Sequence, residues 1–437
     1  MGFLLVLILV LVDVIIVVVV VCAQRRTFPL VTVPRSPGAS PERDRRIDGE
    51  RVNSNTNLRN STQPNPGGNV LTKPIISADS HITEPPDTYT ARIDKKFKDR
   101  APHIVRNDRM GDVFVIDGLD TPIPMGLVAA AGKPPEEIRV GGVLFEELHR
   151  SGWDPQARLA DQDRDGIAGE IIYPTVGMLL CNHPDFDYKK ACFDAYNLWI
   201  AEYCDAHPER LFGCGQTAVR SPDETIEDFR KIKDLGLRGV MMPGHPQQED
   251  YDSPIYDPVW QAAVDLELPL SFHILTGKND GLGGPTRGPR MNSFLSVIRG
   301  CQDIMGMFVL GAVFERNPQL KIVCVEADAG WVPHYMYRMD HAYKRHRNWL
   351  PAGALSKLPS EYFREHIYLT FQDDWVAFQM TDMCNPRRLM WANDFPHSDS
   401  TWPWSQDMLK EHTTHLTPEE KDWILHDNVA ELYQLPL

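Results

Sequence analysis

The sequence predicts a closed (β/α)8 barrel, the TIM-barrel class of α/β folds. Between residues 73 and 437, eight short apolar runs alternate with helical segments, and several of these runs end on a polar side chain. Strands that alternate with helices form a parallel sheet, and eight of them in a chain of this length close into a barrel. An open, doubly wound sheet is the alternative, but no glycine-rich phosphate-binding motif follows the first run.

The first 72 residues are expected to lie outside the barrel. Residues 1–23 are almost wholly apolar and precede Arg25 and Arg26, a pattern typical of a membrane anchor or signal-like segment. The positive-inside rule then predicts a cytoplasmic catalytic domain, 73–437, tethered to a membrane through residues 1–22. An upstream extension without a function is the alternative. Residues 24–72 lack periodicity and are rich in polar residues, proline and glycine, so they are predicted to be a disordered linker.

The predicted strands are short and apolar. The first runs from Ile75 to Asp79, and Pro85 and Pro86 end the regular structure soon after it because proline cannot donate to a sheet ladder. Residues 89–151 carry many charges and are predicted to be an insertion with one short strand at 113–116. The other seven barrel strands are predicted at 168–174, 211–216, 239–242, 269–274, 320–326, 366–370 and 388–394.

Helices are predicted between most of these strands. The clearest begins at Ser221, which is a favoured N-cap residue, with Pro222 in the first helical position and Gly236 at its end. The others are predicted from apolar periodicity at 188–207, 255–266, 294–317, 331–347, 375–383, and from 404 and 418 onward.

Polar residues at the strand ends are the candidate functional residues. Asp79 and His81 are two positions apart on a strand, so their side chains point to the same side. His273, Glu326 and Asp394 end the fifth, sixth and eighth strands, and the carboxyl ends of barrel strands meet at one mouth. Each would lose hydration there without a partner. Because carboxylate oxygens and imidazole nitrogens suit a divalent cation, Asp79, His81, His273 and Asp394 are predicted to bind one jointly.

Composition narrows the classes of partner. The formal net charge of −15 at pH 7 and the lack of a Lys/Arg-rich run exclude a nucleic-acid partner, which needs a basic face. The eight cysteines form no C-x-x-C pair and lie mostly among apolar residues, so they are predicted to be buried free thiols.

Five motifs, in this order along the chain, resemble the amidohydrolase-related metal-dependent enzymes. They are Asp79-x-His81, Ser271-Phe272-His273, the block 314–323, Glu326 with the following 330–333, and the block 391–399. Within that superfamily the chain is similar to the branch of aminocarboxymuconate-semialdehyde and γ-resorcylate decarboxylases. The resemblance covers residues 73–437 and implies a TIM barrel with one catalytic divalent metal ion, Zn or Mn, on Asp79, His81, His273 and Asp394.

Two positions depart from the pattern of this family. Asp79 stands where relatives often have the first histidine of an H-x-H pair, and Glu326 stands where many place a histidine that serves as acid or base. The fourth strand, 238–242, has no lysine that could be carbamylated to bridge two metal ions, which disfavours a binuclear site.

The resulting hypothesis is a metal-dependent, non-oxidative decarboxylase that acts on a small aromatic or unsaturated carboxylic acid. Asp394 is expected to protonate the carbon as CO2 leaves, assisted by Glu326 or His397. The alternative roles are a loop or capping residue for His397 and an ion pair with Arg338 for Glu326. A hydrolase of a lactone, ester or amide is the alternative enzyme, and a non-catalytic, membrane-tethered binding barrel is the alternative from another class. The protein is expected to form a homo-oligomer.

Overall fold

The computed structural model describes residues 72–277 and 287–437. The segments predicted as membrane anchor, 1–23, and as linker, 24–72, therefore lie outside the described residues except for the last one. The described part is the predicted catalytic domain.

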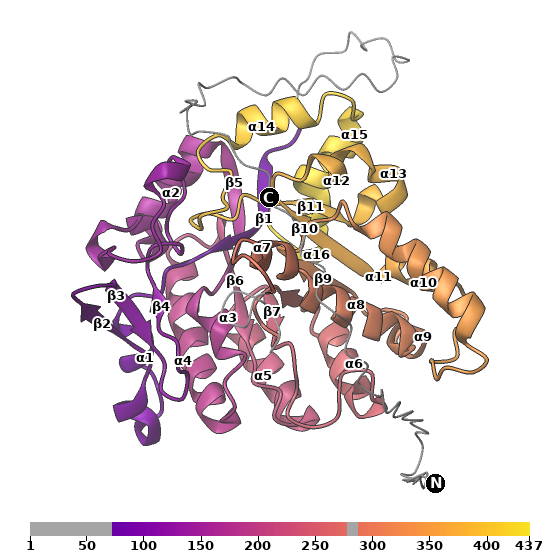
Figure 1. Cartoon of the computed structure of the whole chain (residues 1–437), viewed down its shortest axis with the longest axis horizontal. Helices are drawn as coiled ribbons and strands as arrows, with labels where there is room; N and C mark the ends of the chain where they lie inside the picture. The colour runs from indigo at the N-terminus through magenta and orange to yellow at the C-terminus, as the bar shows by residue number, and fades with distance from the viewer. Residues whose placement is uncertain (1–71, 278–286) are drawn as a thin grey trace, which may run out of the picture. The chain divides into compact units, whose positions relative to one another are not determined.

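Eight parallel strands form the barrel, surrounded by helices (Figure 1). Strand β1 (Ile75–His81) pairs with β5, and each later strand pairs with the next one as far as β11. The closing contact runs between the two ends of this order, because the Asp394 amide donates to the Asp79 carbonyl over 3.1 Å and the His81 amide donates to the Phe395 carbonyl over 2.7 Å. The predicted fold class is therefore confirmed, and the open sheet is wrong. The other strands are β5 (Ile167–Tyr173), β6 (Leu211–Gln216), β7 (Gly239–Met242), β8 (Leu270–His273), β9 (Ile322–Val325), β10 (Ile367–Phe371) and β11 (Leu389–Trp391).

The helices follow the predicted order with two kinds of difference. The single helix predicted at 294–317 is three helices, α7, α8 and α9, and the break between α8 and α9 falls where Ala312 adopts a left-handed φ of 58°. Helices α1, α2, α3 and α11 were not predicted. The bounds are α1 (Asp87–Thr90), α2 (Pro155–Asp165), α3 (Val176–Leu180), α4 (Phe186–Asp205), α5 (Pro222–Asp234), α6 (Asp257–Asp265), α7 (Asn292–Ser296), α8 (Arg299–Leu310), α9 (Val313–Arg316), α10 (Val332–His346), α11 (Pro359–His366), α12 (Trp375–Gln379), α13 (Thr381–Cys384), α14 (Ser405–His412), α15 (Pro418–Asp422) and α16 (Asn428–Tyr433).

Local chemistry explains where α2 and α5 begin and end. The Ser221 hydroxyl accepts from the Glu224 amide at the start of α5, as predicted. At the start of α2 the Asp154 carboxylate accepts from the amides of residues 156 and 157, with Pro155 in the first helical position. Gly166 then ends α2 at a φ of 71°, a left-handed conformation that glycine adopts without strain.

The insertion after β1 forms a small antiparallel sheet of β2 (His103–Asn107), β3 (Gly111–Val115) and β4 (Ile123–Pro124). Its later part reaches the exit of the last barrel strand. The Ala131 amide donates to the Pro396 carbonyl, and the Ser398 amide donates to the Leu127 carbonyl, both over 3.0 Å. The insertion therefore supports the loop that carries Asp394.

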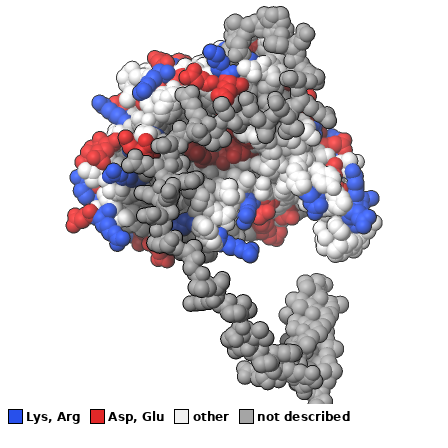
Figure 2. Space-filling model, turned by 45° about the horizontal axis from the view of Figure 1, so that its top comes forward, with Lys and Arg blue, Asp and Glu red and all other residues white. Residues whose placement is uncertain are grey.

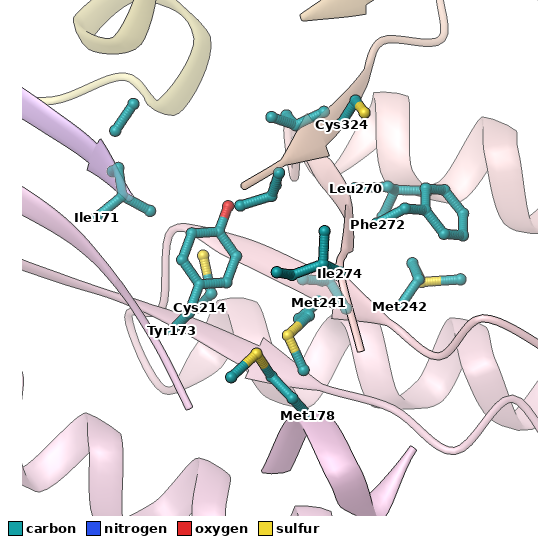
Figure 3. Close-up of a cluster of buried hydrophobic side chains, with 14 of the residues drawn as sticks. Ile171, Tyr173, Met178, Cys214, Met241, Met242, Leu270, Phe272, Ile274 and Cys324 are labelled. Carbon is teal, nitrogen blue, oxygen red and sulfur yellow. The ribbon is translucent and has the colours of Figure 1, made fainter. Parts of the chain in front are cut away.

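Figure 3 shows the apolar core, with Met241, Phe272 and Cys324 among side chains from several barrel strands. The hydroxyl group of Tyr173 lies among them and forms hydrogen bonds with the Ser271 hydroxyl over 2.8 Å and the Tyr433 hydroxyl over 3.0 Å. The seven described cysteines are buried and form no disulfide with one another, as predicted, whereas Cys22 lies outside the described residues.

The stretch Asn292–Leu310, which spans α7 and α8, is the one described helical stretch long and apolar enough to cross a membrane. Its place in the fold is that of a barrel helix, since α8 contacts β8 and β9.

The packing of the helical layer can be tested at Phe308 on α8. It is fully buried, and its ring centroid lies 5.3 Å from that of Trp260 and 5.2 Å from that of Phe272. We expect Phe308→Ala to lower the free energy of unfolding by about 3–5 kcal/mol, because it leaves a cavity among these rings. Urea unfolding followed by tryptophan fluorescence measures this change. Phe308→Leu is the control, and equal losses in both variants would contradict the packing argument.

Candidate metal centre

Asp79 and His81 end strand β1 and are both completely buried. The register of β1 against β5 shifts between Ser77 and Ser80, so the strand is irregular just where the acidic residue stands. His81 Nδ1 lies 2.9 Å from the Pro174 carbonyl and donates to it. This hydrogen bond assigns the proton to Nδ1. The lone pair of the ring is therefore on Nε2, which points toward the axis of the barrel.

His273 ends strand β8 in the same way. Its Nδ1 donates to the Ile274 carbonyl over 3.0 Å, so its Nε2 also carries a lone pair. The two Nε2 atoms of His81 and His273 are 3.3 Å apart. Two nitrogen lone pairs at this distance repel each other unless a proton or a cation lies beside them.

Three carboxyl groups surround the two nitrogens. His81 Nε2 is 3.4 Å from Asp79 Oδ1 and 3.4 Å from Asp394 Oδ1, while His273 Nε2 is 3.3 Å from Glu326 Oε2. Both oxygens of Asp79, both of Asp394 and Oε2 of Glu326 are buried without a hydrogen-bond partner among the described residues. Buried polar atoms rarely lack partners, so five in one cluster indicate a missing ligand that accepts electron pairs.

The pKa values show the electrostatic conflict within this cluster. Burial and the nearby Asp394 raise the pKa of Glu326 well above its usual range, and burial together with Asp79 does the same to Asp394. Burial also acts on Asp79, but His273 and His81 outweigh it and lower the pKa of that carboxyl. Burial lowers the pKa of His81 to about 3. The acids therefore cannot all ionise together unless a cation compensates their charge.

The residues present fit a divalent metal ion. Asp79, His81, His273 and Glu326 can each place one donor atom within 4.8 Å of the others, and His81, Glu326, Asp394 and His397 form a second such group. Imidazole nitrogen and carboxylate oxygen are ligands for Zn and Mn. The cluster can therefore hold one divalent metal ion.

Two of these acidic residues have unusual backbone conformations. Asp394 has a φ of 50° and Glu326 a φ of 56°, in the left-handed region that costs a non-glycine residue about 1–3 kcal/mol. The Glu326 amide donates to the Thr370 hydroxyl over 2.9 Å, and the Asp394 amide donates to the Asp79 carbonyl, so neighbouring strands hold both residues in place. Strain of this kind clusters at functional sites.

His397 lies against the metal-binding cluster and not in a separate loop. Its ring stacks on His81 with centroids 3.9 Å apart, and its Nδ1 is 3.1 Å from Asp394 Oδ1. The Thr175 hydroxyl donates to the Ile82 carbonyl over 2.6 Å, so it must accept from His397 Nε2, which lies 2.9 Å away. This leaves Nδ1 facing Asp394. Burial lowers the pKa of His397 to about 3.

A cavity of about 330 Å³ adjoins this loop and is lined by Ser398, Asp399 and Asp373, among others. Burial raises the pKa of Asp399, as it does that of Asp328. Figure 2 shows acidic side chains gathered in a hollow near the middle of one face. The lining of the cavity includes two acids and neither lysine nor arginine.

Three of the predicted ligands, Asp79, His81 and His273, form one group with Glu326, whereas Asp394 belongs to the second group, with His81, Glu326 and His397. The predicted set of four ligands therefore stays a prediction. Glu326 turns into the cluster, whereas Arg338 is exposed, so the alternative of an ion pair between them is wrong. Sequence reasoning missed Thr175 and the buried Arg158, because neither lies in a motif. A threonine after the second barrel strand was the available signal for Thr175.

Comparison with known proteins agrees with this geometry. The family model described as amidohydrolase matches residues 99–435. The chain belongs to the amidohydrolase family. This confirms the family predicted from the five motifs.

Characterised members of the family that resemble this chain are decarboxylases. The 2-amino-3-carboxymuconate-6-semialdehyde decarboxylase of Dictyostelium discoideum is 25% identical over 273 residues, which are 60% of this chain and 71% of that protein. The gamma-resorcylate decarboxylase of Rhodococcus jostii is 24% identical over 287 residues, 59% of this chain and 82% of that protein.

Solved structures of the family share the fold. An amidohydrolase from Mycobacterium avium subsp. paratuberculosis covers 83% of this chain and all of its own, with a TM-score of 0.67 and 20% identity. A 5-carboxyvanillate decarboxylase from Novosphingobium aromaticivorans, complexed with manganese, covers 64% of this chain and 79% of its own, with a TM-score of 0.54 and 19% identity.

The Asp394→Asn substitution should weaken metal binding but raise the thermal stability of the metal-free protein. We expect Asp394→Asn and His273→Ala to weaken Mn2+ binding by roughly tenfold or more, since removing even an outer partner of a ligand costs 10- to 100-fold. Metal-free Asp394→Asn should nevertheless melt at a higher temperature than metal-free wild type, because it removes a buried carboxyl that is costly to ionise. Elemental analysis and thermal unfolding measure the two effects.

His334→Ala is the control for both measurements, because His334 is exposed on α10. Stoichiometric metal that persists in both cluster variants would refute the assignment of these ligands.

Proposed function

We propose that this protein is a metal-dependent carboxy-lyase that removes CO2 from a small aromatic or unsaturated carboxylic acid. The observation that carries the proposal is the buried cluster of Asp79, His81, His273 and Asp394 with its unpartnered carboxylate oxygens. The decarboxylase relatives support the reaction class, and the manganese in a solved relative supports Mn2+ over Zn2+ as the ion. A non-catalytic binding barrel is disfavoured, because histidine and acidic side chains that could hold a metal ion gather at the barrel mouth.

Asp79, His81 and His273 would hold the ion together with Asp394. When bound, a divalent cation supplies the positive charge that orients a substrate carboxylate and stabilises the negative charge that develops on its carbon skeleton. This charge matters here because the cavity beside His397 is lined by acids. Burial also excludes water, which strengthens each of these electrostatic interactions.

Proton delivery is the task of the Asp394 and His397 pair. In a decarboxylation the bond between the ring or vinyl carbon and the carboxyl carbon breaks, CO2 leaves, and the electron pair stays on the substrate carbon. Asp394, whose Oδ1 lies 3.1 Å from His397 Nδ1, would take up a proton and donate it to that carbon. His397, oriented by Thr175, would pass a replacement proton from solvent to Asp394. Glu326 would assist as a second protonated acid.

Carbon dioxide release from a panel of hydroxybenzoates and unsaturated dicarboxylates, with Mn2+ or Zn2+ added, tests the proposal. In D2O the product should carry one deuterium at the carbon that lost its carboxyl group. Asp394→Asn should lower kcat by about 10²-fold or more, since general acid catalysis contributes about that much. Hydrolysis of lactones, esters or amides by the wild type without any CO2 release would instead make the protein a hydrolase.

We further propose that the catalytic domain is cytoplasmic, tethered by residues 1–22, and homo-oligomeric. The apolar composition of that segment supports the tether. Three exposed apolar residues at α7, Met291, Phe294 and Leu295, support an interface between subunits. The full chain should sediment with membranes in cell fractionation, while a chain that begins at residue 73 stays in the supernatant. Light scattering on the latter should give a multiple of the monomer mass, and a monomer would refute the oligomer.

A further inference from the structure

A buried polar network joins the first and last strands of the barrel. Helix α2, which packs on β5, contributes Arg158, a second donor in Gln162 and the acceptor Asp165. The members are exposed by at most 2% and comprise Ser77, Arg158, Gln162, Asp165, Glu170, Asn393 and Ser405.

Arg158 is the only described cation in this network, and it is completely buried. Its Nε donates to Glu170 Oε2 over 2.6 Å. Its two terminal nitrogens donate to backbone carbonyls, one to that of His81 over 2.8 Å and the other to that of Phe395 over 3.3 Å. The Phe395 ring also lies beneath the guanidinium, with its centroid 4.8 Å away. One planar group thus contacts β5, the end of β1 and the segment after β11.

These contacts lie where the first and last strands of the barrel meet. The ladder of strand pairs runs from β1 through β5 to β11, and in the described chain no ladder pairs β11 with β1. Two backbone hydrogen bonds and the bonds between Ser77 and Asn393 join them instead. Three of the four metal-binding side chains, those of Asp79, His81 and Asp394, belong to the segments that meet here.

We propose that Arg158 is a positioning residue for the metal centre: held by Glu170, its guanidinium fixes the carbonyls of His81 and Phe395 and thereby the three ligands that β1 and the segment after β11 supply. The Phe395 carbonyl accepts from both Arg158 and the His81 amide, so it links the guanidinium of Arg158 directly to the proposed ligand His81. Glu170 extends the link to Asn393, the neighbour of Asp394, over 3.4 Å.

A lysine cannot replace Arg158 in this arrangement. The guanidinium presents its donors in a fixed plane and uses three of them in different directions, whereas an ammonium group is a single point charge on a flexible stem. Glu170 is satisfied in the same fixed geometry, because its Oε2 also accepts from Gln162 Nε2 over 2.8 Å. Arg158→Lys therefore keeps the positive charge but loses the set of hydrogen bonds that joins Glu170 to the His81 and Phe395 carbonyls.

This inference rests on the proposed metal site, and Mn2+ affinity tests it without relying on activity. We expect Arg158→Lys to raise the Mn2+ dissociation constant by about 10- to 100-fold in competition with a fluorescent chelator, the range seen when a partner of a metal ligand is removed. Arg164→Lys is the matched control, since Arg164 is exposed on the same helix, and it should leave the constant unchanged.

A purely structural role would give a different result. Arg158→Lys would then lower the melting temperature of the metal-free protein while the Mn2+ dissociation constant stayed that of wild type, and this result overturns the proposal. If Arg158→Lys does not fold, Arg158→Met combined with Glu170→Met replaces the ion pair by an apolar pair, a change that buried pairs often tolerate. Wild-type affinity in that double variant also overturns it. A wild-type protein that binds no Mn2+ would overturn the proposed metal site itself.

Discussion

The constraint on which the structure depends is the burial of three carboxyl groups around two imidazole nitrogens. Asp79, Glu326 and Asp394 have oxygens without hydrogen-bond partners among the described residues, in a space where ionised acids repel one another. Removing such groups from water is expensive unless an opposite charge joins them. One divalent cation satisfies all of these groups at once, which no set of hydrogen bonds within the described chain does.

The barrel provides the geometry for this arrangement, and the site in turn strains the barrel. Parallel strands bring residues that are hundreds of positions apart to one mouth. Asp394 and Glu326 occupy left-handed backbone conformations there, and the loop of Asp394 is held by the insertion and by Arg158 on α2. The metal-free protein therefore gives up stability at this mouth for a constellation that only a bound ion makes favourable.

The barrel strands, which recur along the chain, and the polar residues at their ends could be predicted from sequence. All eight strands were predicted because each is a short apolar run, and the candidate residues at the barrel mouth because each follows such a run. The break at Ala312 could not be predicted, since a left-handed conformation at an alanine depends on tertiary contacts. Arg158 lies among charged residues in a helix with no apolar stripe to mark it, and its burial depends on β1, β5 and β11 together.

The hydrogen bonds around His397 bear on the choice between a decarboxylase and a hydrolase. The Thr175 hydroxyl has one proton and gives it to the Ile82 carbonyl, so His397 Nε2 must donate to Thr175 and Nδ1 must face Asp394. Asp394 Oδ1 and His397 Nδ1 can therefore share one proton. A hydrolase needs a base at this position to take a proton from water, whereas decarboxylation needs an acid to give one to carbon. A proton shared between Asp394 and His397 is placed for donation to carbon, which is why the geometry favours the release of CO2.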